Sequence, residues 1–220
     1  MNNIVSNIVE KIKKTHTDID TVLVFGSAIT EDWTTESDID VFLIDDSFDD
    51  SRSEETIDGV LVEYQEGNFE IIKKHIEAER GNLLHRNLST MIATAVVAST
   101  NSPEKISELV SLAKDVLSSK FDYTDEDIKL WRYSILDYLA KAKKDVIRND
   151  EIAFYFDAHY VLQNALEMSL ALNGTFMPQP KNLAATLKDT DPDLLAIWKE
   201  FMASNSIAEK LDIISKLSSR

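Results

Sequence analysis

The chain of 220 residues contains no cysteine, only four prolines and five glycines, and far fewer basic than acidic residues. Without cysteine it has neither a disulfide framework nor a zinc site built from thiolates, so a bound metal would need oxygen or histidine ligands. The absence is compatible with a reducing compartment. Because 44% of the residues are hydrophobic, the chain can still bury the core of one large domain or two small ones.

Basic residues are the scarcer of the two charged groups. Only 23 Lys and Arg stand against 39 Asp and Glu, which gives a formal net charge of -16. This charge repels the phosphates of nucleic acids and of anionic membrane surfaces. We therefore expect no nucleic-acid partner, whereas a cationic small molecule would be attracted.

Long apolar runs are also absent. No window approaches the roughly 20 apolar residues that a membrane-spanning helix needs. The N-terminus lacks a basic region followed by a long apolar stretch, which a secretory signal would require. The sequence thus predicts a cytoplasmic protein that does not enter a membrane.

Hydrophobic periodicity divides the chain into two parts. The first part combines short β-branched runs with helical patterns, whereas the second is helical throughout. We therefore predict an α+β fold, with a small mixed sheet flanked by helices over 1–120 and an all-α bundle over 121–220. The expected strands are 21–25, 39–44 and 59–65; the expected helices are 4–14, 69–79, 88–99, 102–119, one capped by Thr124, 151–172, and shorter ones around 183, 194–201 and 207–217. The acidic run 45–55 is expected to be a solvated loop.

The stretch FGSAITEDWTTESDID, residues 25–40, contains the most informative pattern. Asp38 and Asp40 are two residues apart at the start of a strand, so both carboxylates point to one side. Carboxylate oxygens suit Mg²⁺, which leaves its other positions to water and substrate phosphate. Gly26 allows a phosphate to approach the backbone, and Ser27 adds a hydroxyl. Taken separately, however, the two halves would be an ordinary Gly-Ser turn and an Asp-rich loop.

These residues, followed by an acidic residue on a later strand, resemble the motif of the polymerase beta-type nucleotidyltransferase superfamily. The resemblance covers about the first hundred residues and is specific to the superfamily rather than to a substrate. The matching residues are Gly26-Ser27, Ser37-Asp38-Ile39-Asp40 and Glu63 in Val60-Leu61-Val62-Glu63-Tyr64.

The resemblance implies a role for each of these residues. Asp38 and Asp40 would bind two Mg²⁺ ions that orient the nucleotide and neutralise the leaving pyrophosphate. Glu63 would be either the general base toward the acceptor hydroxyl or a further metal ligand. Residues expected to contact the nucleotide are Gly26, Ser27 and Ser37.

Two alternatives for the third acid remain open. Glu63 would face solvent without a function if its strand lies at the edge of the sheet, because an alternating strand exposes half of its side chains. Glu66 lies close enough in the sequence to be mistaken for it.

Other polar residues give weaker signals. Basic residues within 73–86 could contact a triphosphate, although such clusters are more often solvated helix faces. His159 and Gln163 fall on the apolar stripe of the helix 151–172, which indicates either an acceptor pocket or a hydrogen-bonded core histidine. Lys181 follows a Pro-rich turn and could reach the phosphates, but such a loop needs no function.

The layout of an α/β half followed by a helical half resembles the kanamycin and lincosamide nucleotidyltransferases, which inactivate antibiotics. That resemblance implies Mg²⁺-dependent transfer of AMP from ATP to a hydroxyl of a small, cationic acceptor such as an aminoglycoside, with release of pyrophosphate. The helical half would bind the acceptor or form a homodimer.

Two other functions remain open. One is AMP transfer to a protein hydroxyl, as in toxin–antitoxin systems. Arg148 is not followed by a histidine four to six residues later, so the helical half lacks the ribonuclease motif of the associated toxins. The other is a nucleotide-binding module without catalysis.

Overall fold

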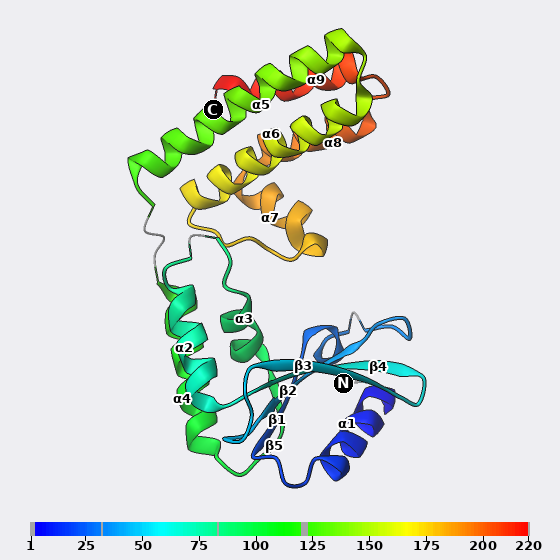
Figure 1. Ribbon diagram of the computed structural model, residues 1–220, viewed down its shortest axis with the longest axis vertical. Coiled ribbons are helices and arrows are strands. Elements are labelled where there is room, and N and C mark those ends of the chain that lie inside the picture. Colours follow the sequence, from blue (N-terminus) through cyan, green and yellow to red (C-terminus); the bar gives the residue numbers. More distant parts are fainter. Residues whose placement is uncertain (1–2, 32, 83, 120–122, 220) are drawn as a thin grey trace. The chain divides into compact units, whose positions relative to one another are not determined.

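The computed structural model describes residues 3–31, 33–82, 84–119 and 123–219, and the chain forms two compact units (Figure 1). The first unit comprises residues up to Asn82 together with Arg86–Ser119, and the second comprises Leu83–His85 and the chain from Lys120 onward. The first unit combines a sheet with helices, and the described part of the second is helical. The predicted α+β fold class is confirmed.

The first unit is built around a five-stranded mixed sheet with the order β3-β4-β2-β1-β5. Strands β2 and β4 run parallel, and the other neighbouring pairs are antiparallel. In chain order its elements are α1 (Asn3–Thr15), β1 (Thr21–Phe25), the 3-10 helix η1 (Gly26–Ile29), β2 (Ile39–Ile44), β3 (Ser51–Ile57), β4 (Val60–Gly67), α2 (Phe69–Glu79), α3 (Asn87–Thr94), β5 (Val96–Thr100) and α4 (Pro103–Ser118).

Helices cover both faces of this sheet (Figure 1). Helix α1 buries Ile8 and Ile12 against one face, which carries Val41 of β2 and Val62 of β4. Helices α2 and α4 pack on the other face, which includes Phe42 of β2. Since side chains alternate along a strand, the even-numbered residues of β2 and the odd-numbered residues of β4 share this second face.

Two sequence-based element assignments are wrong. The acidic run 45–55, predicted as a loop, enters a strand at Ser51: β3 is an edge strand whose side chains are almost all exposed. The helix predicted over 88–99 ends at Thr94, and Val96–Thr100 pairs with β1 as the opposite edge strand. Both strands are at an edge, where burial on one or both faces is incomplete and hydrophobic alternation is therefore weak.

The second unit is dominated by two long helices joined by a short turn. Thr124 and Asp127 form a reciprocal capping box at the start of the first, which confirms Thr124 as its cap. Gly174, with a positive φ of 63°, follows the end of the second. The elements are α5 (Asp125–Arg148), α6 (Glu151–Leu172), η2 (Pro180–Asn182), α7 (Leu183–Thr190), α8 (Pro192–Ala203), α9 (Ile207–Ser215) and η3 (Lys216–Ser219). Among the described helices, none has both the length and the hydropathy of a membrane span.

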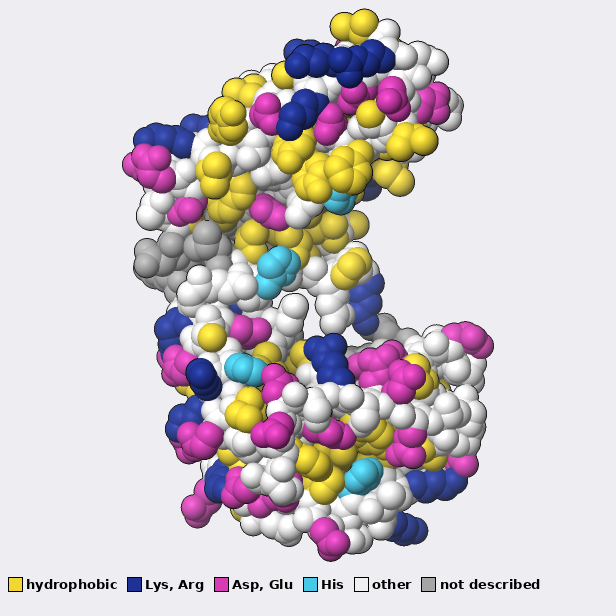
Figure 2. All heavy atoms as spheres, viewed as in Figure 1, with side chains coloured by type: hydrophobic (Ala, Val, Ile, Leu, Met, Phe, Trp, Pro, Cys, Tyr) yellow, Lys and Arg dark blue, Asp and Glu magenta, His cyan; other side chains and the backbone are white. Residues whose placement is uncertain are grey.

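Helix α6 has apolar residues on several sides, and its buried face matches the predicted stripe only in part: of Ile152, Tyr155, Phe156, Leu162 and Leu166, the last two are buried and the first three are exposed. Phe154 and Ala158 are fully buried in the helical core, whereas Ile152 and Phe156 are 86% and 63% exposed. Figure 2 shows hydrophobic side chains gathered on the visible face of this unit. A helix that is hydrophobic all round has no unique stripe, so periodicity could not identify its core face.

A pair of acidic residues links α5 to α6. Asp145 is only 6% exposed, and its Oδ2 has no hydrogen-bond partner within the described ranges. Burial raises the pKa of Asp157, and hydrogen bonding to Asp145 and the charge of Asp145 raise it further; Asp137 adds to this effect, whereas Lys141 opposes it. A protonated Asp157 can donate to Asp145, so the pair is most stable with one shared proton.

We expect Asp157→Asn to raise the melting temperature, and to raise it more at pH 8 than at acidic pH. A folded-state pKa above the unfolded value gives stability at low pH that is lost as the pH rises through the folded pKa. An asparagine amide donates to Asp145 at every pH. Melting curves from pH 5 to 8 test this, with the exposed Asp212→Asn as a control for net charge. A lower melting temperature for Asp157→Asn at pH 8 would contradict it.

Candidate active site

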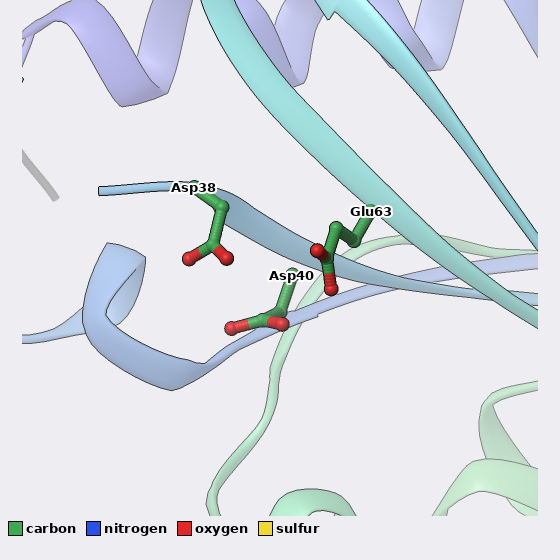
Figure 3. A group of neighbouring side chains, drawn as sticks. All are labelled: Asp38, Asp40 and Glu63. Carbon is green, nitrogen blue, oxygen red and sulfur yellow. The ribbon is translucent and has the colours of Figure 1, made fainter. Parts of the chain in front are cut away.

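Three carboxylates converge at one end of the sheet, on the face that α2 and α4 cover farther along (Figure 3). Asp40 lies in β2 and pairs with Glu63 of β4 in the parallel register, and Asp38 comes just before β2. Each of the three offers one oxygen, and these oxygens all lie within 4.8 Å of one another. Strands β2 and β4 are distant in the sequence but adjacent in the sheet, and their pairing brings together the three acids that the sequence singled out.

The electrostatics of this group favour a cation. Burial raises the pKa of Asp40 to about 6, and the nearby charges of Asp38 and Glu63 contribute to the increase. Three carboxylates at this separation repel one another unless a proton or a cation neutralises them. An all-oxygen donor set with one partly exposed side suits Mg²⁺, which keeps several ligand positions for water and phosphate. The residues present thus fit the metal that the sequence predicted.

Gly26 is required beside this group for two reasons. It has a φ of 71°, in the left-handed region that favours glycine. Because Phe25 pairs with Asp40, the chain leaves β1 next to the Asp40 carboxylate, and a Cβ at Gly26 would overlap Asp40 Oδ2. The Gly-Ser motif therefore makes room for the carboxylate itself, in addition to the predicted approach of phosphate.

Two serines predicted to bind the nucleotide lie on the loop between β1 and β2. Ser27 is in η1 and is partly buried. The Ser37 hydroxyl is 3.2 Å from the backbone nitrogen of Thr34, which can donate to it, and the Ser37 amide donates to the Thr34 carbonyl at 3.0 Å. Ser37 thus closes a turn before Asp38, and a nucleotide contact by either serine stays a prediction.

Trp33 is a site residue that the sequence interpretation missed. The residue is 9% exposed and belongs to the core between α1 and the sheet. Its indole Nε1 donates a hydrogen bond of 3.1 Å to the backbone carbonyl of Asp38. A single aromatic residue within the polar stretch between the two halves of the motif was the available signal.

Glu66 does not join the three carboxylates. It is on the opposite face of β4 from Glu63, where it accepts hydrogen bonds from Ser51 and Ser53 of β3 at 2.6 and 2.7 Å. Glu63, in contrast, is exposed at the site. The geometry distinguishes the two candidates that the sequence left open.

Three of the basic residues within 73–86, namely Lys73, Arg80 and Arg86, are engaged by acids, a hydroxyl and a carbonyl of the same unit. Lys73 pairs with Glu108, and Arg80 pairs with Glu77 and Asp115 at 3.1 and 2.8 Å. The buried Arg86 donates to the carbonyl of Val116 and to Ser119. These contacts support the interpretation as a structural helix face.

The other predicted residues belong to the second unit. His159 and Gln163 lie on the exposed side of α6 rather than on a buried stripe; His159 packs edge-on against Tyr160, and Gln163 donates to Glu167 at 2.9 Å. Lys181 is exposed in η2. Acceptor binding by the first two and nucleotide binding by Lys181 stay predictions.

Comparison with known proteins identifies the domain that carries the carboxylates. A family model described as Polymerase beta, Nucleotidyltransferase matches residues 7–89. The nucleotidyltransferase-like protein from Exiguobacterium sibiricum has a similar fold, with a TM-score of 0.54 and 12% sequence identity over 96% of this chain and 73% of that chain. No curated protein sequence matches the chain. The first unit thus contains a domain similar to polymerase beta-type nucleotidyltransferases.

Proposed function

We propose that the protein transfers a nucleoside monophosphate, namely AMP from ATP, to a hydroxyl group of a small molecule in an Mg²⁺-dependent reaction. The observation that carries this proposal is the convergence of Asp38, Asp40 and Glu63 within the range that matches a nucleotidyltransferase domain. A domain match alone would not require an intact set of acids. Their presence in one group supports catalysis over nucleotide binding alone.

Asp38 and Asp40 would hold Mg²⁺, two ions by analogy with the superfamily. The metal would supply positive charge next to the triphosphate and the leaving pyrophosphate. In the absence of a cation, burial and then the charges of Asp38 and Glu63 raise the pKa of Asp40, so a bound cation would relieve this destabilisation of its charged form. Gly26 would keep the Asp40 carboxylate free of steric overlap, and Ser27 and Ser37 would contact the nucleotide.

Glu63 would act as the general base. In the transfer, the acceptor oxygen bonds to the α-phosphorus of ATP while the bond from that phosphorus to pyrophosphate breaks. The hydroxyl proton passes to the Glu63 carboxylate, and pyrophosphate leaves. Glu63 is the most exposed of the three acids, which suits contact with an acceptor that enters from solvent.

The acceptor would be cationic, as an aminoglycoside is. A net charge of -16 raises the local concentration of amines and repels polyanions. The predicted roles of His159 and Gln163 toward the acceptor, and of Lys181 toward the triphosphate, belong to this proposal. A homodimer and a cytoplasmic location are compatible with it.

A transfer assay tests the function. ATP labelled at the α-phosphate is incubated with the protein, Mg²⁺ and a panel of aminoglycosides, lincosamides and proteins. We expect label on a small acceptor with one pyrophosphate released per transfer, and loss of both when EDTA is added. The exposed Asp49→Asn variant, which makes the same change in charge as a site variant, should retain the activity.

Glu63→Gln, tested in the same assay, separates the two roles of the third acid. A general base predicts a fall in turnover with nucleotide affinity retained, whereas a metal ligand predicts that both fall. Label on proteins only would instead indicate protein AMP transfer. If a non-hydrolysable ATP analogue with Mg²⁺ leaves the melting temperature unchanged and no acceptor is labelled, the enzymatic proposal is wrong.

A further inference from the structure

Asp38 and Asp40 are held in place by different means. Asp40 is inside β2, where the register pairs it with Phe25 on one side and Glu63 on the other. Asp38 precedes Ile39, the first paired residue of the strand. The sheet therefore fixes the backbone of Asp40 from both sides but does not fix that of Asp38.

Trp33 supplies the missing constraint. The residue is 9% exposed and is anchored in the hydrophobic core that α1 forms with the sheet. From there its indole N–H reaches the Asp38 carbonyl at 3.1 Å. The Thr34–Ser37 turn shortens the connection between the two residues, with the Ser37 amide bonded to the Thr34 carbonyl at 3.0 Å. The peptide group of Asp38 is thus attached to a rigid part of the fold.

We propose that Trp33 is a positioning residue for the metal site: its indole hydrogen bond fixes the backbone of Asp38, so that the Asp38 carboxylate is already oriented to bind a divalent cation. This inference rests on the proposed metal role of Asp38 and Asp40. A ligand held in its binding orientation loses less conformational freedom when the cation binds. Divalent-cation affinity should therefore depend on one N–H group that touches neither metal nor substrate.

Trp33→Phe tests the inference because it keeps an aromatic ring in the core and removes the N–H. Mn²⁺, a spectroscopic substitute for Mg²⁺, is titrated and followed by electron paramagnetic resonance without nucleotide. Loss of one hydrogen bond of this kind should weaken Mn²⁺ affinity about three- to tenfold. Glu63→Gln in the same titration shows how far Mn²⁺ affinity falls when an acid next to Asp38 and Asp40 loses its charge.

Trp131→Phe is a matched control. Trp131 is also 9% exposed and also donates an indole hydrogen bond, to Glu167 at 3.3 Å, but it lies in the second unit. It should leave Mn²⁺ affinity unchanged. Melting in EDTA measures any general loss of stability in either variant.

A double-mutant cycle separates positioning from a general structural effect. If Trp33 acts through Asp38, Trp33→Phe should have no further effect on the residual Mn²⁺ affinity of Asp38→Asn. Additive losses, or equal affinities of the wild type and Trp33→Phe, would overturn the inference while leaving the proposed function intact. A wild type that binds no Mn²⁺ would overturn both.

Discussion

Asp40→Asn is expected to abolish nucleotidyl transfer and, in the absence of metal, to stabilise the protein at pH 8. The asparagine side chain would lack the charge that holds a divalent cation, so we expect activity to fall by at least about a thousandfold, equivalent to about 4 kcal/mol of transition-state stabilisation. The gain in stability has a separate cause, namely removal of a carboxylate that burial and two neighbouring acids disfavour.

The sign of the stability change follows from the pKa. The pKa of Asp40 is raised to about 6 from 3.8, so its contribution favours the folded state at low pH and is lost as the pH rises through about 6. At pH 8 the ionised group costs about 1 to 3 kcal/mol in the metal-free protein. Asparagine removes this cost, which corresponds to several degrees in melting temperature.

Melting curves in EDTA at pH 5 and pH 8 measure this effect. The gain for Asp40→Asn should be full at pH 8 and about half as large at pH 5, because the loss in the wild type develops between the unfolded value of 3.8 and the folded pKa of about 6. Mg²⁺ at pH 8 should raise the melting temperature of the wild type and not of the variant. Asp49→Asn is the control, since it changes the same charge at an exposed position. An Asp40→Asn protein that melts below the wild type at pH 8 would contradict this account.

Gly26→Ala is expected to have the second large effect, with a loss of both stability and metal binding. Alanine at a φ of 71° is strained by about 1 to 2 kcal/mol. In addition, its methyl group would overlap Asp40 Oδ2 and displace that carboxylate from the group of three acids. We expect Mn²⁺ binding and nucleotidyl transfer to become undetectable.

Gly59→Ala separates strain from displacement. Gly59 has a φ of 83°, and a Cβ there would meet nothing within 4 Å among the described residues. Both alanine variants should therefore show the loss of stability that comes from strain, whereas only Gly26→Ala should lose Mn²⁺ binding. Retention of wild-type Mn²⁺ affinity by Gly26→Ala would show that Asp40 can move without harm to the site.

The three carboxylates of the candidate site were predictable because each of their signals is local. Asp38 and Asp40 alternate within a few residues, and Glu63 interrupts an apolar strand pattern. Strand β4, which carries Glu63, buries alternate residues, as period-two hydrophobicity reveals, whereas β2, which carries Asp40, is buried at nearly every position and has a continuous apolar run. The parallel pairing that joins them is non-local, and only the structure gives the register of Asp40 with Glu63.

The elements that were missed have weak or ambiguous patterns. Strand β3 is exposed on nearly every side chain, so it has no hydrophobic alternation. The Asp58-Gly59 pair after it, both with positive φ, is a hairpin signal that could have indicated a strand on either side. The hydrogen bond of Trp33 joins a side chain to a backbone carbonyl, and no residue pattern reports such a contact.

The exposed edge strand β3 also affects how the protein behaves in concentrated solution. An unpaired strand edge is the usual route by which the sheets of two molecules join and aggregate. A second copy of the chain that paired with β3 would bring its own Glu54 and Glu55 close to those of the first copy, and these like charges would repel each other. Colloidal stability at neutral pH is thus favoured by the same acidic run that resembled a loop.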